Sequence, residues 1–73
     1  MSETAQMKLD MVTNLASLLM ADNPQLTMEQ ALAIVINSET YQRLQNDKTT
    51  FYYQSPRYVY SFLQTELNRG KIE

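Results

Sequence analysis

One stretch of the sequence, residues 51–63, holds six of the seven aromatic side chains in the chain. Within this stretch, Ser55 is followed directly by Pro56. A serine side chain at a helix start can accept from the unpaired backbone N–H groups, and proline at the first helical position gives up no needed donor. The sequence therefore predicts an aromatic segment that leads straight into a capped helix.

We expect this helix to cover residues 56–69, with one apolar stripe facing the core. Gly70 follows Arg69, and a glycine after the last helical residue commonly provides a left-handed stop. We therefore expect residues 71–73 to be frayed. The expected buried residues of this helix are Tyr58, Val59, Phe62, Leu63 and Leu67.

Helical spacing of apolar residues also predicts helices over residues 3–21, capped by Ser2, and over residues 28–37. Pro24 separates them, because proline disfavours helical geometry in the residue before it. Thr27 and Gln30 have the spacing of a capping box. The residues expected to be buried are Met7, Met11, Val12, Leu15, Ala16, Leu18 and Leu19 in the first helix, and Met28, Ala31, Leu32, Val35 and Ile36 in the second.

A continuous helix beyond Asn37 would turn Tyr41 and Leu44 away from the core. A break at this point, with Ser38 as a new cap, predicts a short helix over residues 39–45 that brings both side chains back inward. The following residues, 46–48, have the composition of a turn.

Residues 49–54 are rich in β-branched and aromatic side chains, as strands are, but the sequence offers no second strand to pair with them. We expect them to lie extended across the helices or to form an edge that pairs with another chain. The predicted fold is thus all-α: a small bundle of three main helices plus one short helix, with an extended aromatic segment before the last helix. It forms a single domain, 1–73, with residues 1–2 also frayed.

The composition argues against catalysis. The chain contains no cysteine or histidine, which removes disulfides, thiolate sites and the usual zinc ligand sets. Gly70 is the only glycine, so there is no glycine-rich phosphate loop. The acidic residues are dispersed along the chain. We therefore expect a protein that is not an enzyme and uses no metal or other cofactor.

Charge and hydropathy limit the cellular location and the binding partners that we expect. The apolar runs are shorter than the roughly 20 residues that cross a bilayer, and the first residues do not resemble a signal peptide, so we expect a cytoplasmic protein. The net charge is −2, which disfavours strong binding to a phosphate backbone. Arg43, Lys48 and Arg57 nevertheless surround the tyrosines, and residues 28–45 have a helix–turn–helix pattern. A nucleic-acid-binding regulator is therefore the alternative function.

Two charged residues fall on the apolar faces of helices, Lys8 in the first helix and Glu66 in the last. Long side chains in terminal turns can reach water past the edge of a core. Alternatively, antiparallel packing of the first and last helices would let Lys8 pair with Glu66, and such a pair would set helix register more than it would add stability.

The tyrosines are too numerous for all of them to face one core, and two readings remain open. Tyrosines in small domains often pack at the edge of the core and hydrogen-bond to backbone groups. They are also typical anchors of protein-binding surfaces. On the second reading, the partner-binding residues are Tyr52, Tyr53, Arg57 and Tyr60.

Taken together, residues 26–31 (LTMEQA), 38–41 (SETY) and 52–60 (YYQSPRYVY) resemble small helical bacterial proteins classed as domains of unknown function. This resemblance implies a neighbouring protein as partner, since genes of such families often lie in operons with those of larger proteins and some are suspected of neutralising or regulating the neighbour. The sequence thus predicts a non-catalytic interaction or regulatory module that binds another protein chain or a second copy of itself.

Overall fold

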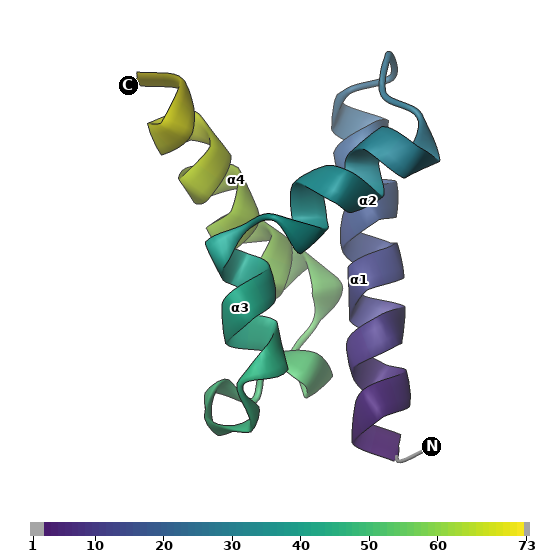
Figure 1. Cartoon of the computed structure of the whole chain (residues 1–73), viewed down its shortest axis with the longest axis vertical. Coiled ribbons are helices and arrows are strands. Elements are labelled where there is room, and N and C mark those ends of the chain that lie inside the picture. The colour runs from purple at the N-terminus through teal and green to yellow at the C-terminus, as the bar shows by residue number, and fades with distance from the viewer. Residues whose placement is uncertain (1–2, 73) are drawn as a thin grey trace.

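A computed structural model describes the backbone of residues 3–72 and the side chains of residues 3–69 (Figure 1). It contains helices α1 (Glu3–Asp22), α2 (Met28–Ile36), α3 (Glu39–Gln45) and α4 (Pro56–Ile72). Two short 3-10 turns, η1 (Asp47–Thr49) and η2 (Phe51–Tyr53), connect α3 to α4. The described part of the chain contains no strand. The predicted all-α fold is therefore confirmed.

The helices pack around one apolar core. Figure 1 shows α2 folding back across the C-terminal part of α1, with α4 rising in the same direction as α1 and leaning away from it. Helix α3 packs against α4 and η2. The buried apolar residues are Met11, Val12, Leu15, Ala16, Leu19, Ala31, Val35, Leu44, Phe51, Val59, Tyr60 and Leu63.

Local sequence signals set most helix boundaries. The backbone N–H of Gln30 donates to the hydroxyl of Thr27 at 3.1 Å, and the N–H of Thr27 donates to the amide oxygen of Gln30 at 2.9 Å. This is the predicted capping box at the start of α2. The hydroxyl of Ser38 accepts from the N–H of Tyr41 at 3.0 Å, so the predicted cap of α3 is also confirmed.

Helix α4 begins as predicted but ends later. The hydroxyl of Ser55 accepts from the N–H of Tyr58 at 3.2 Å, and Pro56 is the first helical residue. The predicted stop at Gly70 is wrong, because the helix continues through Ile72. Glycine permits the left-handed conformation without requiring it. The predictions for residues 1, 2 and 73, including the Ser2 cap, lie outside the described residues.

The segment predicted to be extended, residues 49–54, is instead coiled into η1 and η2. Its backbone N–H groups have no neighbouring strand, and they bond locally: Thr50 N to Asp47 O at 3.3 Å, and Tyr53 N to Thr50 O at 3.3 Å. The predictions of an extended segment and of a strand edge are therefore both wrong. Local turns satisfy the same groups that a strand would leave unpaired.

In α1 and α2, three side chains predicted to be buried, Met7, Met28 and Ile36, are exposed. Met28 and Ile36 are the first and last residues of α2, and Met7 lies near the start of α1. Leu18, Leu32 and Tyr41 are partly buried against the core. The middle turns of the predicted stripes in α1 and α2 are therefore buried, whereas their ends are not.

The Lys8–Glu66 pair, one of the two alternatives that the sequence left open, is absent. The ammonium of Lys8 donates to Asp47 Oδ1 at 2.6 Å and to the carbonyl of Gln45 at 3.0 Å. The physical reason is direction, since α1 and α4 run the same way (Figure 1) and their charged residues therefore lie toward opposite ends of the bundle.

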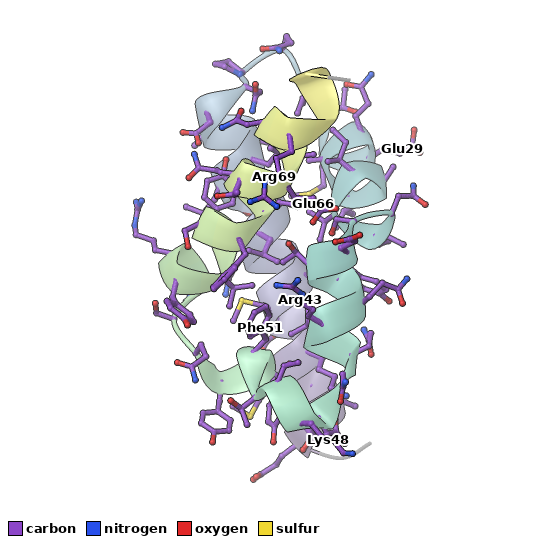
Figure 2. The ribbon with its side chains drawn as sticks, turned by 90° about the vertical axis from the view of Figure 1, so that its left-hand side faces the viewer. Glu29, Arg43, Lys48, Phe51, Glu66 and Arg69 are labelled. Atoms are coloured by element: carbon purple, nitrogen blue, oxygen red, sulfur yellow. The ribbon has the colours of Figure 1, made fainter. Side chains whose placement is uncertain are left out.

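Glu66 instead caps the start of α3. Its carboxylate accepts from the backbone N–H of Glu39 at 2.6 Å and from the N–H and hydroxyl of Thr40 at 3.0 and 2.9 Å. These N–H groups belong to the first turn of α3, where a helix has no internal partner for them. Figure 2 shows Glu66 on α4 and Arg43 on α3 on the same side of the molecule.

Candidate functional site

Five aromatic rings gather where η2 meets the first half of α4. The ring centroids of Phe51 and Phe62 lie 5.2 Å apart, as do those of Tyr58 and Phe62. Tyr52 and Tyr53 form an edge-on pair at 5.1 Å. We call these five residues together with Arg57 the aromatic surface.

Some rings of the aromatic surface are buried in the core, and others are exposed to solvent. Phe51 belongs to the core, and its ring also contacts Tyr58 edge-on at 6.4 Å. Tyr58 is 50% exposed and Tyr53 is 58% exposed. Edge-on ring contacts of this kind stabilise a fixed arrangement. The exposed tyrosines therefore stand on a packed support rather than on a loose loop.

The residue before η2 has a left-handed backbone conformation. Thr50 has φ 54° and ψ 21°, and it is the only non-glycine residue with positive φ in the described part of the chain. A β-branched residue in this region is strained. The reversal at Thr50 separates η1 from η2, which carries the buried Phe51 and the exposed Tyr53. Such strain is more common at functional sites than elsewhere.

The remaining members lie at the edges of the aromatic surface. Tyr52 is partly buried, and the ammonium of Lys8 lies 5.9 Å from its ring centroid, within the range of a cation–π contact. Arg57 is exposed in the first turn of α4, and its guanidinium makes no hydrogen bond or ion pair within the described residues. Arg57 is thus a cation available to a partner.

Tyr60 does not belong to this surface. It is 6% exposed, and its hydroxyl donates to Asp22 Oδ2 at 2.7 Å. Burial, followed by this hydrogen bond and the charge of Asp22, raises the pKa of Tyr60 to about 12. The predictions for two tyrosines are therefore reversed: Tyr60, expected outside the core, is buried, and Tyr58, expected in the core, is exposed.

A groove of about 1190 Å³ separates the C-terminal half of α4 from the end of α1 and from α2. Leu19, Leu26, Ile34 and Leu67 supply apolar lining. Two acidic groups here are engaged inside the fold: Asp22 accepts from Tyr60 and from Gln64 Nε2 at 3.2 Å, and Glu66 accepts from Thr40. The polar residues of the groove thus connect α4 to α1 and α3.

The basic residues considered for nucleic-acid binding do not form one cluster. Figure 2 shows Arg43 near Arg69 and the acidic Glu66, whereas Lys48 lies in η1 at the lower end of the molecule. In α3, Thr40 and Leu44 face the core, so the exposed side of this seven-residue helix is short. The residues of the predicted helix–turn–helix therefore present little positive charge together.

Within residues 3–69, no group of three or more acidic, histidine or cysteine side chains is arranged to hold a metal ion. Among the helices of the described chain, none is both long and apolar enough to cross a membrane. Comparisons with protein-family models, curated proteins and solved structures found no match.

Proposed function

We propose that this chain is a non-catalytic protein-interaction module that regulates another protein chain, and that the aromatic surface is its contact site. The observation that carries the proposal is the pair of tyrosines, Tyr53 and Tyr58, half or more exposed above rings packed onto the core. We further propose that the module acts in the bacterial cytoplasm and uses no cofactor.

The chemistry of the surface favours a protein partner. A tyrosine ring buries a large apolar area with few rotatable bonds, and its hydroxyl can still hydrogen-bond at the edge of an interface. Arg57 adds a planar cation that can pair with a carboxylate. Such a surface fits a partner patch with an apolar centre and an acidic rim.

The partner is proposed to be a different protein. The resemblance to small bacterial proteins that accompany larger ones supports this choice. The alternative of a nucleic-acid-binding regulator differs in its dependence on salt, because contacts to a phosphate backbone release counterions and weaken steeply as salt rises. Binding through tyrosines to an apolar protein patch depends little on salt.

The test compares retention of partners from cell extract by the wild-type chain and by two variants. Tyr53→Ala removes an exposed ring that contacts only Tyr52 among the ring contacts described. Leu9→Ala is the control, since Leu9 is 55% exposed and lies on α1, outside the aromatic surface. We expect Tyr53→Ala to weaken binding of the retained protein about tenfold or more, as truncation of an anchor residue does.

Thermal unfolding should be nearly unchanged in both variants, because both positions are exposed. Equal retention by the wild-type chain and Tyr53→Ala would overturn the proposal, as would equal loss in Leu9→Ala. Retained material that is released by nuclease or by moderate salt would support the nucleic-acid alternative instead.

A further inference from the structure

The side chain of Lys8 contacts three successive elements of the chain between α3 and α4. Its ammonium donates to the carbonyl of Gln45, the last residue of α3, at 3.0 Å and to Asp47 Oδ1 in η1 at 2.6 Å. It also lies over the ring of Tyr52 in η2, 5.9 Å from the ring centroid. The Lys8 side chain is 16% exposed. One largely buried cation on α1 thus connects this helix to α3, η1 and η2.

Within the described residues, Lys8 is the one residue distant in sequence that hydrogen-bonds to residues 45–54. The other hydrogen bonds of this segment are local, such as that from Tyr53 N to Thr50 O at 3.3 Å. Local bonds fix the internal shape of the turns, whereas contacts with other helices fix where the turns lie. The positive φ of Thr50, 54°, is unfavourable for a β-branched residue and persists only where surrounding contacts hold it.

The three side chains of η2 point in three directions, because a 3-10 helix has about three residues per turn. Phe51 points into the core and packs against Phe62 of α4, with the ring centroids 5.2 Å apart. Tyr52 is partly buried beneath the ammonium of Lys8. Tyr53 takes the third direction and is 58% exposed. Contacts with α4 and with α1 therefore set two of the three directions, and these two determine the third.

We propose that Lys8 is a positioning residue of the aromatic surface, which holds η1 and η2 against α1 so that Tyr53 points toward the partner. Lys8 acts on Tyr53 through Tyr52, because the rings of the two tyrosines are in edge-on contact at 5.1 Å. The inference deepens the function proposed above, and only its consequence for binding rests on that function. It also explains why a charged residue occupies the apolar face of α1.

Nuclear magnetic resonance of the free chain tests the positioning. Lys8→Met keeps a long unbranched side chain and removes the ammonium. We expect the backbone N–H groups of Tyr53 and Gln54, which close η2, to exchange with solvent about three- to fivefold faster, the scale of one lost ion pair. The nuclear Overhauser contacts between the rings of Tyr52 and Tyr53 should weaken, whereas those of Phe51 with α4 should remain.

Thr27→Ala is the matched control for stability. It removes the capping box of α2, which lies at the end of the bundle opposite η1 and η2 (Figure 1), and loss of a cap weakens the fold modestly. Exchange at Tyr53 and Gln54 should stay unchanged in this variant. Circular dichroism checks that every variant keeps its helical content.

Asp47→Ala is a second variant that removes one contact of Lys8 without reaching the core, since the Asp47 side chain is 72% exposed. It should change the same resonance signals in the same direction as Lys8→Met. Unchanged signals in both variants overturn the inference, as does an equal change in Thr27→Ala. If Lys8→Met does not fold, unchanged signals in Asp47→Ala alone overturn it.

Binding separates this inference from the proposed function. The probe is the protein that the wild-type chain retains from extract, purified. We expect Lys8→Met to bind it about three- to fivefold more weakly, because a loosened turn must be ordered on binding, and Tyr53→Ala to lose more. Altered signals of η2 with full binding by both variants would overturn the aromatic surface as contact site and leave the positioning intact. Unaltered signals in Lys8→Met with weak binding by Tyr53→Ala would overturn the positioning alone.

Discussion

The two ends of α3 are each held by a side chain from a distant helix, and the two contacts differ in their surroundings. At the start of α3, the partly buried carboxylate of Glu66 accepts from two backbone N–H groups and one hydroxyl. At its end, the Lys8 side chain, which is 16% exposed, reaches the carbonyl of Gln45 and the side chain of Asp47, which is 72% exposed. An anion thus sits at the N-terminus and a cation at the C-terminus, as the helix dipole favours.

The two contacts differ in how far their charged groups are exposed to water. Partly buried, charged hydrogen bonds to otherwise unpaired backbone donors contribute more than exposed ion pairs, which are screened by water and salt. Helix α3 has only seven residues, too few to be stable alone. We therefore infer that Glu66 holds α3 in place, and that Lys8 mainly positions the chain that follows it.

The largest expected effect comes from Glu66→Ala. This change leaves the first N–H groups of α3 and the hydroxyl of Thr40 without their acceptor, and we expect it to lower the free energy of unfolding by about 2–3 kcal/mol. Chemical denaturation measures the change. Glu66→Gln keeps one acceptor oxygen and should lose about half as much. A loss for Glu66→Ala no greater than that for Lys8→Ala would contradict the comparison.

The contact between Tyr60 and Asp22 is a single hydrogen bond from a neutral donor to a carboxylate, whereas Glu66 accepts three such bonds and Lys8 forms an ion pair. Tyr60→Phe removes only the hydroxyl and should lower the free energy of unfolding by about 1 kcal/mol at neutral pH, the usual contribution of one hydrogen bond. This value lies between those expected for the two ends of α3. Urea denaturation of both proteins at the same pH measures it.

The same pair predicts a dependence on pH. The pKa of Tyr60 is about 12 in the folded chain and about 10 when unfolded. The stability linked to this group is thus fully present below about pH 10. Above it, the unfolded chain loses the proton first, and stability falls by up to roughly 2–3 kcal/mol as pH rises toward 12. Tyr60→Phe lacks this loss, so the stability difference between the two proteins should shrink or reverse; a constant difference would contradict the assignment.

The smallest expected effect belongs to Lys8. Lys8→Ala and Asp47→Ala should each lower the free energy of unfolding by less than about 1 kcal/mol, because the pair is largely exposed on the Asp47 side. A double-mutant cycle measures their coupling. The coupling should decrease when salt is raised from low to molar concentration. A coupling above that of Glu66 with Thr40 would reverse the order proposed for the two ends of α3.

Much of the candidate site was open to prediction from sequence, but not all of it. Tyr53 and Arg57 are exposed as predicted, and Tyr52 is partly buried. Tyr58 was missed because aromatic residues occur on several sides of the start of α4, so a helical wheel does not identify a unique buried face. The acceptor Asp22 decides that Tyr60 is the buried one, and Asp22 lies 38 residues away along the chain.

The sequence by itself determined the features that act over a few residues. Thr27 with Gln30, Ser38, and Ser55 with Pro56 mark helix starts, because a side chain there reaches a backbone group three residues away. Only the tertiary structure decided the partners of Lys8, Glu66 and Tyr60, which join residues 26 to 39 apart. These outcomes depend on the direction of α4 relative to α1, which follows from packing of the whole core and from no local pattern.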